Sequence, residues 1–166
     1  ILDHLQDPGN LGTIMRAAEA AGVTGILMSS DCVDIYNPKT IRSTMGALYR
    51  VPFVVSEDFA GDIERLKKAG VSTYAAHLGA TISYEGADYK KPCAFMIGNE
   101  ANGLSDEVAA LADCKILIPM AGQVESLNAA MAATVLMFEA DRDEIEFAVR
   151  NNARNVRFCE WVSSEL

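Results

Sequence analysis

The sequence predicts an α/β fold in which helices flank a mostly parallel β-sheet. Short apolar runs, typical of buried strands, alternate along the chain with longer stretches of helix-forming residues. Several apolar runs lead into a loop rich in glycine or proline and then into a helix, which is the order of elements in parallel α/β units. At 166 residues, half of them hydrophobic, the chain has the size of one globular domain, and we treat residues 1–166 as one unit.

The first strand–helix–strand unit lies at the start of the chain. Residues 1–5 form a short apolar strand, and the sequence DPGNLG at residues 7–12 predicts a turn-rich loop. Residues 13–21 predict a helix that ends at Gly22, a residue suited to the left-handed conformation that closes many helices. Residues 25–29 are the second apolar strand. The unit predicts two parallel strands joined by a helix.

The middle of the chain continues the alternation. In order we expect helix 37–49, strand 51–55, helix 63–69, strand 73–76, a short loop at 77–80, an irregular exposed segment at 84–91, strand 93–97, a glycine loop at 98–104 and helix 106–112. Ser105 is placed to cap the last of these helices, because a serine hydroxyl can accept from a free backbone N–H of the first turn.

The segment 115–139, KILIPMAGQVESLNAAMAATVLMFE, contains a strand, a loop and a helix. Residues 116–118 are an apolar strand that Pro119 ends, because proline cannot donate to a β-ladder. Residues 120–125 form a loop, and Ser126 is the expected N-cap of a helix that runs to about residue 140. The remaining residues, 141–166, are charged and helical in character, contain Trp161, and show no site.

Composition limits the classes of function. The net charge of −9 argues against a large basic surface for nucleic acid. Four scattered cysteines and two histidines form no metal-binding pattern, so we expect reduced thiols and no metal. No apolar run reaches the roughly 18 residues of a membrane span, and no signal peptide is visible, which predicts a soluble cytoplasmic protein. Because the chain starts at Ile1 inside a strand, we expect it to be a domain of a longer protein.

Three loops, at residues 7–12, 98–104 and 119–128, each follow an apolar strand and precede a helix. In a parallel sheet they lie at the carboxyl edge, where α/β proteins bind ligands, so we expect them to converge. The fragment GNLGTIMR is neither a phosphate-binding loop ending in GKS or GKT nor a GxGxxG dinucleotide motif. A generic nucleotide cradle is therefore disfavoured.

The fragments NLGTIMRAAEAAG, FMIGNEANGLS and ILIPMAGQVESLNAAMA resemble the three ordered motifs of the SpoU, or TrmH-like, RNA 2′-O-ribose methyltransferases. The intervening NPKTIRSTMGALYRVPF also resembles that family, so the resemblance covers residues 1–139. It implies an S-adenosylmethionine-dependent enzyme that methylates tRNA or rRNA. It also implies a SPOUT fold with a C-terminal trefoil knot and a homodimer, neither of which the hydrophobic periodicity predicts.

The resemblance also assigns site residues. The polar functional positions are Asn10, Arg16, Glu100, Ser126 and Asn128. The positions that hold the methyl donor are Gly98, Asn99, Ile118, Pro119, Met120, Ser126 and Leu127, with Leu78 and Gly79 as a looser match to a third wall. Each polar residue also has a local explanation: Asn10 as a turn residue, Arg16 as a solvated surface arginine, Glu100 as a capping group.

The residue types suit methyl transfer to oxygen. A ribose hydroxyl becomes a nucleophile when a base removes its proton or a cation stabilises the alkoxide. The family assigns this role to the arginine matching Arg16, yet a guanidinium does not deprotonate in proteins. We therefore expect Arg16 to act by position and charge, while Lys39, Arg42 and Arg50 are candidates for a phosphate track or for a solvated face. An additional N-terminal domain would explain how an acidic chain recognises RNA.

Two other classes of function are compatible with the sequence. One is a non-catalytic RNA- or nucleotide-binding module that keeps the pocket, and the other is an α/β oxidoreductase that uses a dinucleotide. The polar motif residues argue against the first, and the missing GxGxxG motif argues against the second. Alanine-rich stretches in the helix 13–21 and in the helix after Ser126 favour close helix packing, either in the core or at a dimer interface in which the active site is shared.

Overall fold

The computed structural model describes residues 1–151, and the side chains of residues 1–143. Its strands are all paired in parallel. One sheet has the order β4-β6-β3-β5 and the other has the order β1-β2. Their bounds are β1 (Ile26–Ser29), β2 (Phe53–Ser56), β3 (Ser72–Ala76), β4 (Ile82–Ser83), β5 (Cys93–Met96) and β6 (Cys114–Leu117). The predicted α/β class with a parallel sheet is therefore confirmed.

The N-terminal segment joins the two sheets. Leu2 forms parallel bridges to Met28 within β1 and to Ile97 directly after β5. The N–H of Leu2 donates to the carbonyl of Leu27 at 2.8 Å, and the N–H of Asp3 donates to the carbonyl of Ile97 at 2.9 Å. The predicted strand at residues 1–5 is thus reduced to one bridging residue. Its pairing ends because His4 adopts a left-handed conformation, with φ of 52°, which turns the chain out of the sheet.

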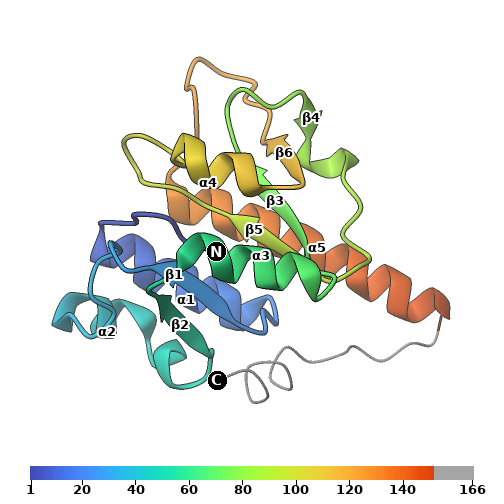
Figure 1. Cartoon of the computed structure of the whole chain (residues 1–166). Coiled ribbons are helices and arrows are strands. Elements are labelled where there is room, and N and C mark those ends of the chain that lie inside the picture. Colours follow the sequence, from blue (N-terminus) through green and yellow to red (C-terminus); the bar gives the residue numbers. More distant parts are fainter. Residues whose placement is uncertain (152–166) are drawn as a thin grey trace.

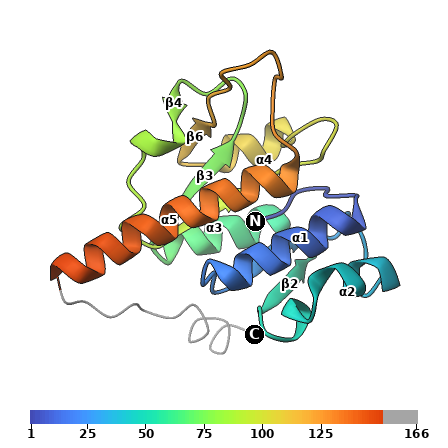
Figure 2. The same ribbon diagram turned by 180° about the vertical axis from the view of Figure 1, so that it is seen from behind.

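Helices cover both faces of the sheet (Figures 1 and 2). The helices α1 and α5 lie side by side on one face, with α2 packed on α1, while α3 and α4 lie on the other face. The bounds are α1 (Pro8–Ala20), α2 (Pro38–Thr44), α3 (Phe59–Lys68), α4 (Asp106–Leu111) and α5 (Ala129–Asn151), with short 3-10 turns η1 (Ala47–Tyr49) and η2 (Tyr84–Gly86). No helix in the described part of the chain is long and apolar enough to cross a membrane.

The two faces have separate hydrophobic cores. Under α1 and α5 the core contains Leu11, Met15 and Leu136, and under α3 and α4 it contains Ile63 and Met96. Several of the alanines noted in the sequence are buried in the chain's own core, namely Ala18, Ala130 and Ala133. They let α1 and α5 approach closely within one subunit, so only the remaining small residues of these helices are free to face a partner.

The first helix begins five residues earlier than the sequence predicted. Residues 8–12 are the first turn of α1 rather than a loop. The Asp7 side chain accepts from the N–H of Asn10 at 2.7 Å and acts as the N-cap, while Pro8 occupies the first helical position, where its missing N–H costs nothing. Gly22 has the expected left-handed conformation, with φ of 67°.

Other boundaries also differ. The predicted helix 37–49 is interrupted at Met45 and Gly46, which are both left-handed, so α2 ends at Thr44. The segment 84–91 is not fully exposed, because Tyr89 packs edge-on against Tyr74 and is 3% exposed. The predicted cap Ser105 is confirmed, since its hydroxyl accepts from the N–H of Val108. The predicted helical character of the tail, with Trp161, falls partly on residues 152–166, which lie outside the described residues.

Candidate active site at the carboxyl edge of the sheet

Three of the predicted polar residues meet at the carboxyl edge of the sheet. Asn10 lies in the first turn of α1, Glu100 in the loop after β5, and Asn128 directly before α5. The amide nitrogen of Asn10 donates to Oε1 of Glu100 at 3.0 Å. The amide nitrogen of Asn128 donates to the amide oxygen of Asn10, also at 3.0 Å. Residues 118 positions apart in the chain are thus joined by a continuous run of hydrogen bonds, as the convergence of the loops predicted.

Glu100 is the acceptor on which this network depends. Its carboxylate also accepts from the backbone N–H of Asp7 at 3.0 Å and of Gln6 at 3.2 Å. Partial desolvation raises the pKa of Glu100, but the hydrogen bonds from Asn10 and from backbone N–H groups outweigh it and hold the pKa below its usual value. Glu100 is therefore a carboxylate at neutral pH. Because a carboxylate only accepts, it fixes which end of the Asn10 amide faces it.

Asn128 has a second role as the N-cap of α5. Its side-chain oxygen accepts from the N–H of Ala130 at 2.9 Å and of Met131 at 3.3 Å. The prediction that Ser126 caps this helix is wrong, because the helix begins at Ala129 and Ser126 lies in an exposed loop. Asn128 caps the helix because it is the residue directly before the first helical turn, where an Asn side chain caps as well as a serine does.

The glycine loop after β5 is tightly folded. Asn99 and Gly103 exchange two backbone hydrogen bonds of 2.9 and 2.8 Å, and the side-chain oxygen of Asn99 accepts from the N–H groups of Ala101 and Asn102. A Cβ at Gly98 would lie 2.1 Å from the backbone of Gly103. Any other residue at position 98 would force the loop to open, because the backbone of Gly98 packs directly against the backbone of Gly103 and Leu104.

The other loops at this edge present backbone groups and apolar side chains. In the part of the chain that the structure describes, the backbone N–H groups of residues 120–127 have no hydrogen-bond partner. Leu78, after β3, and Leu127, after β6, are exposed, as are Gly79 and Pro119. Ile118 and Met120 are half-buried. Free donors next to apolar surface suit a cofactor with both polar and apolar parts.

Arg16 does not join this network within one chain. It lies six residues after Asn10 on α1, which turns it by about 120° away from the face that carries Asn10. Its side chain is exposed and makes no hydrogen bond or ion pair with any residue that the structure describes. The structure therefore brings together Asn10, Glu100 and Asn128 but leaves Arg16 and Ser126 apart from them.

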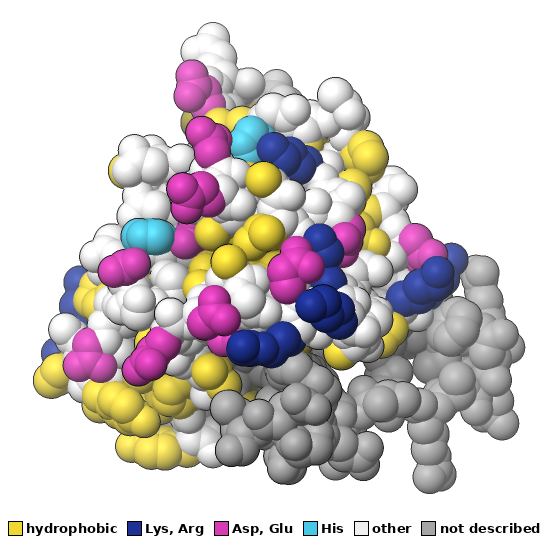
Figure 3. Space-filling view, in the orientation of Figure 1, with side chains coloured by type: hydrophobic (Ala, Val, Ile, Leu, Met, Phe, Trp, Pro, Cys, Tyr) yellow, Lys and Arg dark blue, Asp and Glu magenta, His cyan; other side chains and the backbone are white. Residues whose placement is uncertain are grey.

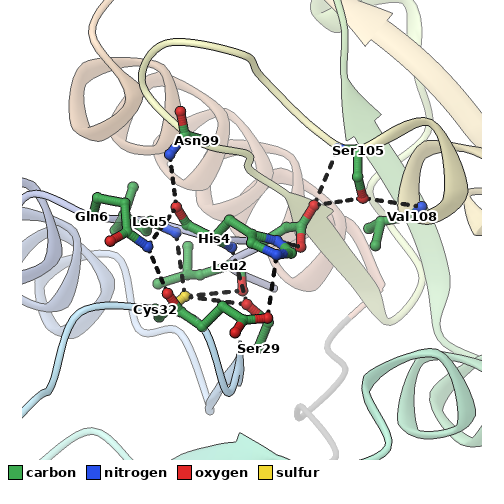
Figure 4. A network of polar contacts seen from close by, with 11 residues as sticks. Leu2, His4, Leu5, Gln6, Ser29, Cys32, Asn99, Ser105 and Val108 are labelled. Carbon is green, nitrogen blue, oxygen red and sulfur yellow. Dashed lines mark hydrogen bonds and ion pairs between the residues drawn. The ribbon is translucent and has the colours of Figure 1, made fainter.

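The sequence reasoning missed how residues 3–7 hold the glycine loop in place. The carboxylate of Asp3, only 1% exposed, accepts from the N–H and the hydroxyl of Ser105 at 3.1 and 2.9 Å (Figure 4). The side chain of Asn99 donates to the carbonyl of His4 at 2.9 Å. A hydrogen bond with Asp3 raises the pKa of His4. The Asp7-Pro8 pair in the sequence could have predicted the helix cap. The hydrogen bonds to backbone groups of residues 3–7 could not have been predicted, because every residue type offers the same backbone groups except for the missing N–H of proline.

No group of three or more His, Cys, Asp or Glu side chains that could hold a metal ion occurs among the described residues. Among the described residues, Cys32, Cys93 and Cys114 are not in disulfides. Burial raises the pKa of the Cys32 thiol. Cys159 lies outside the described residues.

Comparisons with known proteins agree with this architecture. The model of the SpoU rRNA Methylase family matches residues 1–138. A Synechocystis protein named an uncharacterized tRNA/rRNA methyltransferase is 40% identical over 87% of this chain and 53% of its own length. The Bacillus subtilis 23S rRNA (guanosine(2553)-2′-O)-methyltransferase is 35% identical over 83% of this chain and 55% of its own length. The chain spans about half the length of these curated relatives.

Solved structures give the same result. The SpoU methyltransferase AviRb from Streptomyces viridochromogenes, in complex with the cofactor AdoMet, has a TM-score of 0.80 at 35% identity, over 87% of this chain and 59% of that one. An AdoMet-bound rRNA methyltransferase from Sinorhizobium meliloti has a TM-score of 0.79 at 40% identity, over 85% of this chain and 54% of that one.

Proposed function

Because the chain belongs to the SpoU rRNA methylase family, we propose that it is the catalytic domain of an RNA methyltransferase. The proposed reaction transfers a methyl group from S-adenosylmethionine to a ribose 2′-hydroxyl of tRNA or rRNA, and we propose that it takes place in the cytoplasm. The observation that carries the proposal is the hydrogen-bonded run from Glu100 through Asn10 to Asn128 at the edge of the sheet. A chain that had kept only the fold would not need these three side chains in fixed orientations.

The methyl donor would be held by the three loops beside this network. We assign it to the backbone of Gly98 and Asn99, of 118–120 and of 126–127, with Leu78 and Gly79 as a further wall. The free N–H groups of residues 120–127 and the exposed Leu78 and Leu127 suit the polar and apolar parts of S-adenosylmethionine. When bound, the donor supplies an electrophilic methyl group on a sulfonium, so the proposed site needs no metal.

The protein's own residues would prepare the acceptor. In the proposed reaction the bond from the 2′-oxygen to the methyl carbon forms as the bond from sulfur to that carbon breaks, and the hydroxyl proton leaves to solvent or a base. Asn10 and Asn128 offer amide groups that can orient a ribose, and Glu100 holds Asn10 in place. Arg16 would bind the neighbouring phosphate and stabilise the developing alkoxide by its charge.

Arg16 would act from a second subunit. Arg16 is exposed and points about 120° away from Asn10 around α1, so it does not reach the site of its own chain. This supports a homodimer in which α1 of one subunit faces the site of the other. The outer faces of α1 and α5 carry Ala20, Met131 and Phe138, all exposed and suited to such an interface. By analogy with the family, we also propose that the loops at residues 98–104 and 118–128 belong to a trefoil knot.

The shared site has a direct test. We would mix Arg16→Ala and Asn128→Ala subunits, each inactive as a homodimer, and verify subunit exchange by native mass spectrometry. A shared site restores activity, because mixed dimers hold one intact site and one doubly damaged site. If exchange occurs and no activity returns, each site is built within one subunit.

Donor binding separates the proposal from its alternatives. Calorimetry of the chain with S-adenosylmethionine should give a defined affinity, and calorimetry with nicotinamide dinucleotides should give none. Binding of the dinucleotide instead would support the oxidoreductase. Donor binding without methyl transfer to any RNA would support the non-catalytic module.

A further inference from the structure

The segment 35–56 has a charge opposite to that of the chain. It contains Lys39, Arg42 and Arg50 and no acidic residue, whereas the whole chain has a net charge of −9. Arg50 forms a two-pronged ion pair with Glu19 of α1, with its Nη2 at 2.8 Å from the carboxylate. Arg42 is exposed and has no side-chain partner among the described residues, and the exposed Lys39 has only a long ion pair of 3.9 Å with Asp7, so these two cations are more open to a ligand than Arg50 is.

Exposed apolar side chains lie beside these cations. Tyr36 is 64% exposed, Met45 71% and Tyr49 81%, and the hydroxyl of Tyr49 has no partner among the described residues. We call Tyr36, Lys39, Arg42, Met45 and Tyr49 the α2 surface. Figure 3 shows hydrophobic side chains gathered over the region where α2 and β2 lie in Figure 1. A hollow of about 290 Å³ adjoins Tyr36 and Phe53.

The backbone holds Met45 outward at a cost. Met45 has φ of 50°, a left-handed conformation that non-glycine residues rarely adopt, and it is followed by the left-handed Gly46. The preceding residue, Thr44, anchors the turn, because its side chain is buried and its hydroxyl donates to the carbonyl of Ile41 at 2.8 Å. Such conformations persist where a fold has a use for them, and this one exposes an apolar side chain instead of burying it.

The α2 surface adjoins the candidate active site. A Cβ at Gly12 would lie 1.7 Å from the hydroxyl of Ser43, so α2 and α1 touch without space between them. At the start of α2, Nζ of Lys39 lies 3.9 Å from the carboxylate of Asp7. The N–H of Asp7 in turn donates to Glu100. A strand of nucleic acid that reaches the network at Glu100 can therefore continue past Lys39 onto the α2 surface.

We propose that the α2 surface binds a single-stranded segment of the substrate RNA next to the methylated nucleotide. This inference rests on the proposed function. Lys39 and Arg42 would contact phosphates, and the rings of Tyr36 and Tyr49 would stack on bases, which is the combination that single-strand binding uses. A second copy of the chain fits the surface less well, because a two-fold contact would bring two patches of the same positive charge together.

The test measures binding without catalysis. The full 166-residue chain is titrated against a fluorescein-labelled single-stranded RNA of mixed sequence, about 16 nucleotides long, in fluorescence anisotropy at several salt concentrations. The double variant Lys39→Ala/Arg42→Ala should bind at least about tenfold more weakly, and the slope of log affinity against log salt should fall by about 1.4, or 0.7 for each lost phosphate contact. The control Lys68→Ala/Lys91→Ala makes the same change of charge at two other exposed lysines and should bind as the wild type does.

Tyr49→Ala should weaken binding about tenfold, and Tyr49→Phe, which keeps the ring, should not. Donor affinity should be unchanged in every variant. The inference is overturned if the wild type binds no RNA, if the double variant binds like its control, or if Tyr49→Ala instead dissociates the dimer in size-exclusion chromatography.

A methyl-transfer assay on the same variants, run beside this titration, separates the inference from the proposed function. If the RNA affinity depends on the α2 surface but no methyl group is transferred, the surface stands and the proposed function fails. If methyl transfer occurs while the variants bind RNA normally, the α2 surface is wrong and the proposed function stands.

Discussion

Replacing Gly98 by alanine should damage both stability and donor binding, for a reason that the structure makes quantitative. The new Cβ would lie 2.1 Å from the backbone of Gly103 and Leu104, whereas real Cβ atoms essentially never come under 3.0 Å. The loop must therefore open by almost an ångström, which strains the two backbone hydrogen bonds between Asn99 and Gly103. At about 1 kcal/mol for each bond plus the steric term, we expect a loss of about 2–4 kcal/mol in the free energy of unfolding.

The variant should remain folded at room temperature, because domains are typically stable by about 5–15 kcal/mol. Urea unfolding followed by circular dichroism gives the stability, and calorimetry with S-adenosylmethionine gives the affinity, which should fall about tenfold or more. Gly86→Ala is the matched control, because its Cβ would meet only a side-chain carbon of Ile82 at 4.0 Å and it lies outside the loops proposed to hold the donor. If Gly98→Ala proves as stable as this control and binds the donor as well, the loop is not the rigid cradle described.

Three further predictions address the roles of single groups. Arg16→Ala should leave donor affinity within a few-fold and reduce turnover roughly a hundredfold. Arg16→Lys should recover only part of the lost turnover, since lysine cannot make the two parallel hydrogen bonds by which arginine binds a phosphate. Wild-type turnover by Arg16→Ala would remove this residue from the mechanism. Glu100→Gln should cost about 1 kcal/mol of stability at pH 7. Because hydrogen bonds lower the pKa of Glu100 in the folded protein, its contribution is complete above the unfolded value of about 4.3 and declines as the pH falls below it. Urea titrations of both proteins should therefore converge as the pH falls below about 4.3, and a constant difference would contradict the assignment. Treatment with a chelator should leave donor affinity and turnover unchanged, and activity restored only by zinc or magnesium would refute the metal-free site.

The sequence predicted the fold class and the meeting of the loops because both follow from local patterns. Apolar runs followed by glycine loops mark parallel strands, and the carboxyl ends of parallel strands share one edge. The loops that carry Asn10, Glu100 and Asn128 could therefore be predicted to meet, whereas the choice of these three residues within the loops came from the resemblance to the SpoU family. The start of α1 was wrong because DPG was interpreted as a turn, although Asp before Pro is also a good helix start.

Other features depend on contacts that a sequence does not encode locally. Ser126 and Asn128 are both good caps, and Asn128 caps because α5 begins directly after it; its amide also donates to Asn10 near the opposite end of the chain, a contact that no local pattern shows. The N–H groups of Gln6 and Asp7 that lower the pKa of Glu100 are present in every residue type except proline. The bridging position of Leu2 between two sheets likewise follows from topology, because no feature of residues 1–5 distinguishes one bridge from a full strand.

The central claim is that the methyl group goes to a ribose 2′-oxygen, and the position of the label in RNA tests it. The chain is incubated with total RNA and S-adenosylmethionine carrying a radioactive methyl group, and the RNA is then hydrolysed completely in alkali. Alkaline cleavage requires a free 2′-hydroxyl, so a 2′-O-methylated nucleotide survives as an alkali-resistant dinucleotide. We predict that the label is recovered in such dinucleotides and that Asn128→Ala abolishes it. Recovery of the label in mononucleotides, which indicates methylation of a base, would contradict the account.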